Sequence, residues 1–215
     1  MELPSQTSNR MNIAIVGTGN VGGALAERWA QAGHTIRLGV RDTANFKGKA
    51  ELEALPNIST HSIAEAVVAS DVILIAAVPQ ATHDITLALG DVSQKIIIDA
   101  MNGVRFKPEP FQDTTEALRH WTNCPNVVKC FNSTGFENLK NPVYNSVGID
   151  MFMAGNSTTG KAVARQLALD VGFAECYDFG GDDKVLLLEQ FAFAWINLAI
   201  MQGHGRGMAF RVLKR

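Results

Sequence analysis

The chain has 215 residues, enough for one large domain or for a domain with a small appendage, which excludes two full catalytic domains. Hydrophobic residues make up 47% and charged residues 19%, a composition typical of a globular protein rather than of a disordered chain. With 19 basic and 21 acidic residues the formal net charge is −2. Because broad binding to a phosphate backbone needs a surplus of cations, we expect no nucleic acid as a partner.

The predicted strands and helices alternate along the chain. A run rich in Ile and Val predicts a strand over Met11–Val16, followed by glycines and a helical pattern over Asn20–Ala32 that ends at Gly33. A second strand over His34–Val40 completes a βαβ unit. Further strands are predicted at Asp71–Val78, Lys95–Ala100, Asn126–Phe131, Gly148–Ala154 and Phe173–Asp178. Further helices are predicted at Ser62–Ala69, Gln80–Leu89, Thr114–Trp121, Thr158–Val171 and Asp183–Gln202, the third of them beginning at a capping-box-like Asp113 and Glu116.

This alternation predicts the α/β class, with a Rossmann-type, doubly wound, mostly parallel sheet and a C-terminal helical appendage. The central strands are almost continuously apolar, which is typical of parallel strands covered by helices on both faces. We expect residues 1–10 to be a disordered lead-in, residues 11–180 to form the Rossmann domain, and residues 181–215 to form a C-terminal helix and basic tail.

The location of the protein is predicted from its cysteines and its apolar segments. The three cysteines form neither a CxxC pair nor an even disulfide framework: Cys124, Cys130 and Cys176. The lead-in lacks the apolar core of a secretory signal. The apolar stretch Val185–Met201 is interrupted by polar residues and is shorter than the ~20 residues of a membrane-spanning helix. We therefore expect a cytoplasmic protein with no membrane partner.

A GxGxxG motif occupies residues 17–22, between the first strand and the first helix. Gly17 permits the tight turn, Gly19 lets the backbone approach a pyrophosphate, and Gly22 allows close packing of helix against strand. The helix N-terminus supplies free N–H groups and a dipole that favour an anion. The motif in this context predicts a dinucleotide site.

The residue at the end of the second strand predicts which dinucleotide binds. A site for NAD would place a carboxylate there to bind the ribose 2′-hydroxyl, whereas Arg41 stands at this position. A guanidinium binds a 2′-phosphate through charge-assisted, bidentate hydrogen bonds, which favours NADP(H). Asp42 is the alternative, because a shift of one residue in the strand would put its carboxylate at the deciding place. Lys47 and Lys49 either assist the 2′-phosphate or belong to a solvated basic loop.

Other motifs give weaker signals. Residues 155–161 match the first seven positions of a P-loop, but Ala162 replaces the hydroxyl that would hold Mg²⁺, so we expect Ser157 or Thr158 to be an ordinary helix cap. The five histidines show no metal-ligand spacing, and we expect no metal site. Asn102 and the segment Asn132–Thr134 directly follow predicted strands, where they either line a nicotinamide or form turns.

The chain resembles the coenzyme F420-dependent NADP oxidoreductases, which reduce or oxidise a deazaflavin coenzyme. The resemblance covers nearly the whole chain and rests on MNIAIVGTGNVGGALAERWAQAGHTIRLGVRD, on AAVP at residues 76–79 and on the final helix with GHGRG. The segment VVKCFNSTGFENL is also similar to the ferric reductase domain of the six-transmembrane epithelial antigen proteins. Val40 departs from the family, which often has a small hydroxyl residue before the arginine.

The resemblance implies which residues bind NADPH. The cofactor-binding residues would be Gly17, Thr18, Gly19, Asn20, Val21, Gly22, Arg41, Ala77, Val78 and Pro79. The pocket of the nicotinamide and the acceptor would be lined by Val78, Pro79, Asn102, Asn132 and Ser133. No residue is assigned a catalytic role, because hydride transfer between two cofactors needs orientation rather than a covalent catalyst.

We therefore expect an NADPH-dependent oxidoreductase whose acceptor is a deazaflavin or flavin-type cofactor. The alternatives are a ferric, metal-ion or flavin reductase that uses the same NADPH site, and an NADP(H)-binding sensor without turnover. The helix predicted at Asp183–Gln202 is apolar on more than one face, which favours a homodimer through this helix. The tail from Gly203 to Arg215 has four basic residues and no acidic one, and we expect it to complete the acceptor site.

Overall fold

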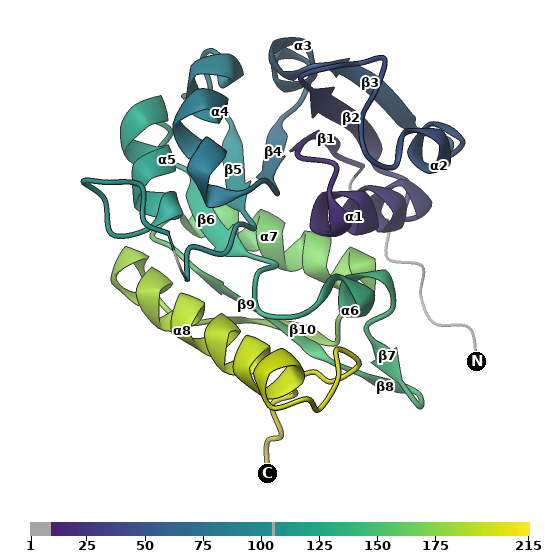
Figure 1. The fold of residues 1–215 in the computed structure, drawn as a ribbon, viewed down its shortest axis with the longest axis vertical. Coiled ribbons are helices and arrows are strands. Elements are labelled where there is room, and N and C mark those ends of the chain that lie inside the picture. Colours follow the sequence, from purple (N-terminus) through teal and green to yellow (C-terminus); the bar gives the residue numbers. More distant parts are fainter. Residues whose placement is uncertain (1–9, 105) are drawn as a thin grey trace.

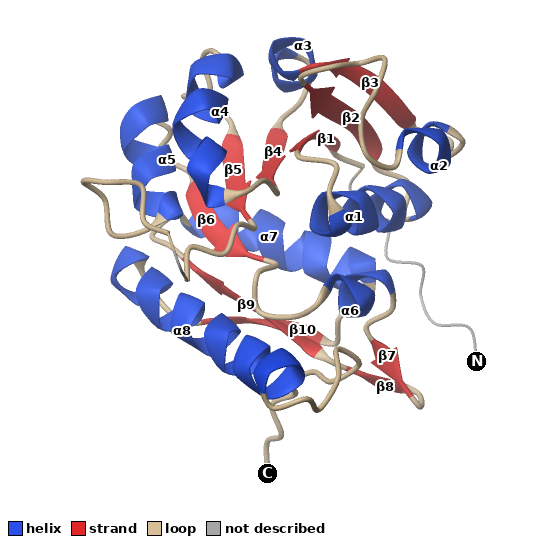
Figure 2. Cartoon of the chain, in the orientation of Figure 1, coloured by secondary structure: helices blue, strands red, loops and turns tan. Residues whose placement is uncertain are grey.

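The computed structural model describes residues 10–104 and 106–215, so the predicted lead-in, apart from Arg10, lies outside the described residues. Eight strands form one sheet in the order β10-β9-β6-β5-β4-β1-β2-β3 (Figures 1 and 2). Their bounds are Asn12–Val16 (β1), Thr35–Val40 (β2), Ile58–Ser62 (β3), Val72–Ile75 (β4), Ile96–Asp99 (β5), Val127–Cys130 (β6), Asp150–Ala154 (β9) and Glu175–Asp178 (β10).

Six neighbouring strands, β6-β5-β4-β1-β2-β3, are parallel to one another. The order of the strands reverses between β1 and β4. This arrangement confirms the predicted Rossmann-type fold, in which ligands bind beyond the carboxyl ends of the strands at the reversal point. β9 runs antiparallel to β6, and β10 runs parallel to β9, so the carboxyl ends of these last two strands lie at the opposite edge of the sheet.

Helices cover both faces of the sheet. Their bounds are Asn20–Gln31 (α1), Lys49–Glu53 (α2), Ile63–Val68 (α3), Thr82–Leu89 (α4), Thr114–Thr122 (α5), Phe136–Lys140 (α6), Thr158–Val171 (α7) and Val185–Ile196 (α8). One apolar core joins β1, β2 and β9 to α1 and α7, and a second joins the other side of β1, β4 and β5 to α3, α4 and α5. α8 packs on Phe152 and Ala154 of β9, through Val185 and Leu188.

The predicted C-terminal appendage is this helix α8, which continues as one wider turn over Asn197–Met201. Among the described residues, the helical stretch Asp182–Met201 is long and apolar enough to cross a membrane by length and composition alone, and 33% of it is buried in the protein. The core helix of a soluble protein meets the same criterion.

Several short elements were not predicted. β3 has the mostly polar sequence ISTHS, and as an edge strand of the sheet it has partly exposed side chains. α2 and α6 have only five residues each, too few for a helical pattern to be recognised. A small hairpin pairs Val143–Tyr144 (β7) with Val147–Gly148 (β8), in place of the first residue of the predicted strand Gly148–Ala154.

The capping of α5 differs in one detail from the predicted capping box. The Asp113 side chain accepts a hydrogen bond from Glu116 N (2.8 Å), as predicted for an N-cap. The Glu116 side chain, however, accepts from Gln112 N (2.8 Å), one residue before the cap.

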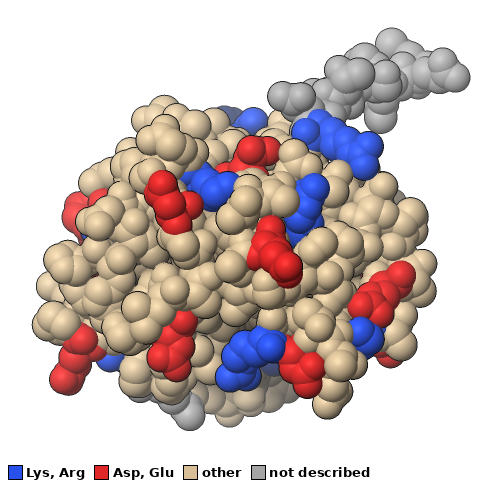
Figure 3. All heavy atoms as spheres, turned by 90° about the horizontal axis from the view of Figure 1, so that it is seen from above, with Lys and Arg blue, Asp and Glu red and all other residues tan. Residues whose placement is uncertain are grey.

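Charged side chains of both signs are interspersed over the face of the molecule that Figure 3 shows, and most of that face is occupied by other residues. This distribution agrees with a net charge near zero.

Candidate functional site

The glycine loop between β1 and α1 has room for a ligand at one of its three motif positions. Gly17 has φ +103°, and a Cβ there would lie 2.5 Å from the Ala76 carbonyl oxygen. A Cβ at Gly22 would lie 1.9 Å from the Gly17 carbonyl oxygen, so the helix and the turn are in direct contact. A Cβ at Gly19 would meet nothing within 4 Å. The space that a pyrophosphate needs is therefore open at Gly19.

Gly19 is the N-cap of α1, and no side chain caps this helix end. The first turn also contains no acidic residue, so the N–H groups and the helix dipole are directed at the open space without competition from a carboxylate. The residues present therefore fit the phosphate groups of a dinucleotide.

Arg41 directly follows β2 and is exposed, and within residues 10–104 and 106–215 it forms neither a hydrogen bond nor an ion pair. The Asp42 carboxylate, in contrast, accepts from Ala44 N (2.8 Å) and Asn45 N (3.3 Å), which closes the turn of its own loop. Lys47 donates to the Asn20 side chain at the start of α1 (2.8 Å), whereas Lys49 pairs with Glu53. The cations available to a ligand at this end are thus Arg41 and Lys47.

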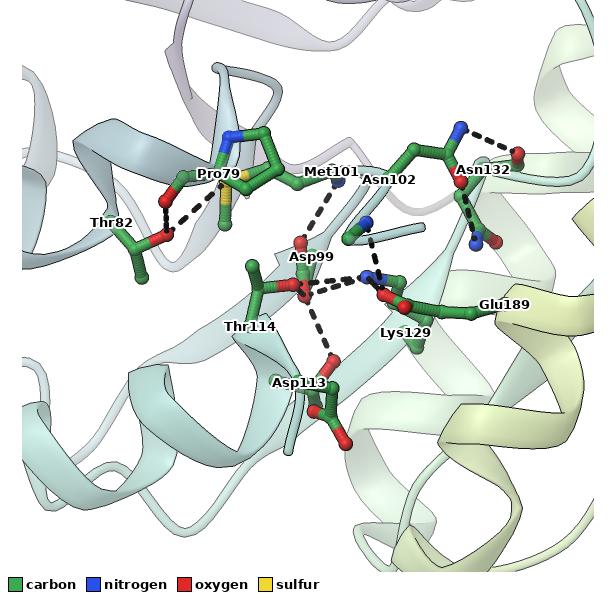
Figure 4. A network of polar contacts seen from close by, with 12 residues as sticks. Pro79, Thr82, Asp99, Met101, Asn102, Asp113, Thr114, Lys129, Asn132 and Glu189 are labelled. Carbon is green, nitrogen blue, oxygen red and sulfur yellow. Dashed lines mark hydrogen bonds and ion pairs between the residues drawn. The ribbon is translucent and has the colours of Figure 1, made fainter. Parts of the chain in front are cut away.

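The other end of the site consists of the segments that follow β4, β5 and β6. The turn after β4 leads through Ala77 and Val78 to Pro79, and Val78 is 63% exposed. Thr82 binds this turn through the Pro79 carbonyl oxygen (2.6 Å) and lies 3.8 Å from the Met101 sulfur, so the turn is linked to the segment after β5 (Figure 4). The exposed apolar surface at this turn suits one face of a flat ring.

Asn102 and Asn132 lie against each other across the ends of β5 and β6. The Asn102 amide donates to the Asn132 carbonyl oxygen (3.1 Å), and the Asn132 amide donates to Asn102 Oδ1 (3.4 Å) (Figure 4). Asn132 Oδ1 is buried and has no hydrogen-bond partner among the described residues. The structure thus brings together the two asparagines that the sequence placed 30 residues apart.

The backbone before Asn132 is in an uncommon conformation. Phe131 has φ +64°, the left-handed region that costs a non-glycine residue free energy, and its ring packs edge-on against Trp29 at 5.5 Å. Ser133 is buried next to the Met151 sulfur (3.5 Å), so its hydroxyl faces the core rather than the open edge. Of the predicted pocket residues, Asn132 and Ser133 are thus both buried, whereas Val78 and Asn102 are exposed.

A buried cluster of charges beneath these segments was not predicted. The Lys129 ammonium lies between two carboxylates, 3.0 Å from Asp99 Oδ2 and 2.8 Å from Glu189 Oε1, and also donates to Thr114 Oγ1 (3.0 Å). All three of its hydrogens are thereby used. Lys129 and Asp99 are fully buried, and Glu189, which reaches in from α8, is 4% exposed.

The charge state of this cluster follows from its neighbours. Burial alone would lower the pKa of Lys129, but the adjacent carboxylates of Asp99 and Glu189 outweigh burial and raise that pKa above its ordinary value. Lys129 is therefore an ammonium ion at neutral pH. Burial raises the pKa of the neighbouring Asp113. The signal in the sequence was a lysine inside the apolar run VVKCF and a glutamate inside an apolar helix, since such residues are rarely buried without a partner.

The P-loop-like segment lies at the opposite edge of the sheet from the glycine loop. Ser157 caps α7 by accepting from Gly160 N (2.9 Å), and its hydroxyl donates to the Asn126 side chain (2.7 Å), just before β6 begins. Lys161 pairs with Asp178 (2.7 Å). The predicted helix cap is therefore confirmed for Ser157.

The C-terminal segment divides into two parts. The loop of residues 203–207 lies beside α6, where Arg206 forms a bidentate pair with Glu137 (2.6 and 3.1 Å) and lies over the rings of Phe136 and Trp195. The pairing with Arg206 lowers the pKa of Glu137. Residues 208–215 contact the start of β9, where Asp150 N donates to the Phe210 carbonyl oxygen (3.2 Å), and strand β8, where Arg211 donates to the Gly148 carbonyl oxygen (2.8 Å).

Comparison with known proteins gives one family and several structures. Residues 12–103 match the family model described as NADP oxidoreductase, coenzyme F420-dependent. The search of curated proteins finds no match.

Among solved structures, a candidate F420-dependent NADP reductase from Arthrobacter sp. FB24 is 22% identical with a TM-score of 0.82, over 95% of this chain and 100% of the other. A hypothetical protein from Sinorhizobium meliloti is 24% identical with a TM-score of 0.69, over 95% and 96%. A reductive aminase from Aspergillus terreus, solved with NADPH, is 18% identical with a TM-score of 0.67, over 91% and 64%.

The family match covers β1 to β5 and therefore includes the glycine loop, Arg41, the turn at Pro79 and Asn102. The solved structures share the fold over almost the whole chain. Both findings agree with the resemblance seen in the sequence: residues 12–103 match the coenzyme F420-dependent NADP oxidoreductase family, and this match indicates an NADP-dependent oxidoreductase.

Proposed function

We propose that the protein is an NADPH-dependent reductase that transfers a hydride between NADP(H) and a planar redox cofactor, with the deazaflavin coenzyme as the preferred acceptor and a flavin as the second choice. NADP(H) binding is supported above all by the open space at Gly19, which lies at an uncapped helix end between Arg41 and the turn at Pro79. The pyrophosphate of NADPH would lie at Gly19, with its 2′-phosphate at Arg41 and its nicotinamide near Val78, Pro79 and Asn102.

The side chains at the nicotinamide end support transfer between two cofactors. The segments 76–79, 101–104 and 131–135 contain no titratable residue. When bound, NADPH supplies the hydride and the acceptor supplies a ring that takes it up with a proton from solvent. The contribution of the chain is to hold the two rings in contact and to exclude water, for which the exposed Val78 and the paired asparagines provide a surface.

Steady-state oxidation of NADPH in the presence of a panel of acceptors tests this proposal. The panel comprises coenzyme F420, FMN, FAD, a ferric chelate and a cyclic imine. We expect turnover with coenzyme F420 and slower turnover with the flavins. Turnover with the ferric chelate or the imine alone would contradict the assigned acceptor class. NADPH binding without turnover by any acceptor would favour a sensor.

The location of the protein is also proposed rather than observed. We place it in the cytoplasm and off the membrane, because α8 packs on β9 and carries Glu189, whose carboxylate pairs with the buried Lys129. If α8 lay in a lipid bilayer instead, Glu189 could not pair with Lys129, and both charges would be left without a partner. Fractionation of cells into soluble and membrane pools, with the protein in the soluble pool, is the expected result.

A further inference from the structure

The two backbone amides on either side of Asn102 are both bound to carboxylates. Asp99 Oδ1 accepts from Met101 N (2.9 Å), and Glu189 Oε1 accepts from Gly103 N (3.3 Å). Asp99 lies at the end of β5, whereas Glu189 comes from α8, 86 residues after Gly103. Asn102 itself is exposed at the edge of the sheet. The backbone of this exposed residue is thus fixed from below at both of its neighbours.

One ammonium group joins the two carboxylates. Lys129 Nζ contacts Asp99 Oδ2 and Glu189 Oε1, the latter being the same oxygen that receives the Gly103 amide (Figure 4). Asp99 Oδ2 also accepts from Thr114 (2.5 Å) and Thr115 (2.8 Å), so the start of α5 belongs to the same network. All three N–H groups of the ammonium have acceptors, and the groups are buried. The directions of these hydrogen bonds therefore fix the positions of the side chains more narrowly than apolar packing would.

Gly103 is adapted to this contact. A Cβ at this position would lie 3.0 Å from both carboxylate oxygens of Glu189, a tight contact, so a larger residue would shift the carboxylate or the loop by a few tenths of an ångström. Glycine is therefore favoured here by the approach of a side chain from α8 rather than by its backbone angle.

We propose that Lys129 and Glu189 are positioning residues that hold Asn102 where it faces the nicotinamide. Through Glu189, the conformation of the segment around Asn102 then depends on α8. This inference rests on the proposed function, since it assigns the nicotinamide to the Asn102 end of the site. Lys129 does not touch the cofactor: it acts through Asp99, Glu189 and the backbone between them.

The test compares two ligands that differ only in the nicotinamide: NADP⁺ and 2′-phospho-ADP-ribose. In Glu189→Leu, which removes the acceptor of Gly103 N at similar volume, we expect affinity for NADP⁺ to fall about fivefold or more, since a hydrogen bond to a charged group is lost. Affinity for 2′-phospho-ADP-ribose should stay within about twofold, because the glycine loop and Arg41 are untouched. Glu189→Gln keeps an oxygen for Gly103 N and should retain most of the NADP⁺ affinity.

A matched control removes a buried polar pair elsewhere. Asp170 pairs with the fully buried His34 (3.0 Å) on the far side of the sheet, and Asp170→Leu should leave both affinities unchanged. Amide hydrogen exchange gives a readout without ligand: residues 100–104 should exchange faster in Glu189→Leu and not in Asp170→Leu. If Glu189→Leu does not fold, Gly103→Ala displaces the same carboxylate without removing it and should change the two affinities in the same unequal way.

Equal losses for the two ligands, or faster exchange of residues 100–104 with an unchanged ratio of affinities, would overturn the positioning role and leave Lys129 and Glu189 as supports of the fold. Failure of the wild-type protein to bind either ligand would instead contradict the proposed function.

Discussion

At the three glycines of the loop after β1, the Cβ of an alanine would have different neighbours. Alanine substitutions can therefore distinguish the glycine that binds the cofactor from those that the fold requires. Gly19→Ala adds a Cβ into open space at a φ of −68°, which alanine adopts without strain. We expect stability to remain within about 0.5 kcal/mol of wild type and NADPH affinity to fall about tenfold or more, because the Cβ occupies the place of the pyrophosphate. Thermal unfolding and a binding titration measure the two effects.

Gly23→Ala is the matched control on the same helix, since its Cβ would meet only the Thr18 carbonyl oxygen at 3.8 Å, an ordinary contact. It should leave NADPH affinity unchanged and raise stability by at most about 1 kcal/mol, because alanine favours a helix over glycine. Full NADPH affinity in Gly19→Ala would show that the pyrophosphate lies elsewhere. At Gly22 the contact of 1.9 Å predicts the opposite behaviour, a loss of stability of about 1–3 kcal/mol.

We propose that Arg41 determines a preference for NADPH over NADH. Arg41→Ala should weaken NADPH binding by about 1.5–3 kcal/mol, the contribution of a charge-assisted hydrogen bond, and should leave NADH binding almost unchanged because NADH has no 2′-phosphate. Titration of both cofactors checks this. Lys49→Ala serves as the control, since Lys49 pairs with Glu53. Equal losses for NADPH and NADH would contradict the role of Arg41.

The sequence could identify residues that act through local spacing but not those that act through distant partners. The glycines and Arg41 occupy fixed positions in one βαβ unit, so their relation is visible in about 30 residues. Lys129 pairs with residues 30 positions before it and 60 positions after it. Only the order of the strands and the packing of α8 on the sheet bring these residues together, and for that reason the buried network was not predicted.

The buried strands were predictable, because a strand that is covered on both faces must be apolar. All the strands of the central sheet except β3 were expected within a few residues, including β10 at the other edge of the sheet. The polar β3 and the five-residue helices have no such requirement. The reversed direction of β9 also has no signature in its own sequence, since it depends on the path of the chain through α6 and the hairpin β7–β8.

The C-terminal segment is expected to contribute to the acceptor site through residues 203–207. Arg206 lies beside α6, close to the segment that follows β6, whereas Arg211 lies on the β9 side. Arg206→Gln should raise the KM for coenzyme F420 several-fold and make it less sensitive to salt, because a cation attracts the anionic acceptor over a distance. Steady-state kinetics at two salt concentrations measure this.

Arg211→Gln is the control for Arg206 and should leave the KM for the acceptor and the affinity for NADPH unchanged. If Arg206→Gln likewise changes neither the KM for the acceptor nor its salt dependence in a folded protein, the C-terminal segment has no part in the acceptor site.

At the scale of the whole molecule, the exposed side of α8 favours a homodimer. Leu187 is 54% exposed, and Ile200 and Met201 in the turn that continues the helix are 51% and 47% exposed. We expect light scattering to give about twice the 23.2 kDa of one chain at micromolar concentration. Leu187→Lys should give a folded single chain, because a lysine would be buried without a partner in the dimer.

Leu87 on α4 is 73% exposed and provides the matched control, since Leu87→Lys places the same charge on a helix outside the proposed interface. A single-chain mass for the wild-type protein, or dissociation by both variants alike, would contradict the assignment of α8 as the interface.

We expect the chain to pass a hydride directly from NADPH to the deazaflavin coenzyme at the carboxyl edge of the sheet. This transfer is tested by a single-turnover reaction of NADPH deuterated at C4, followed by mass spectrometry of coenzyme F420. We predict reduced coenzyme that carries one deuterium when the transferred face of the nicotinamide is labelled, and none when the other face is labelled. Oxidation of NADPH without deuterium in the coenzyme from either label, or no oxidation at all, would contradict the account.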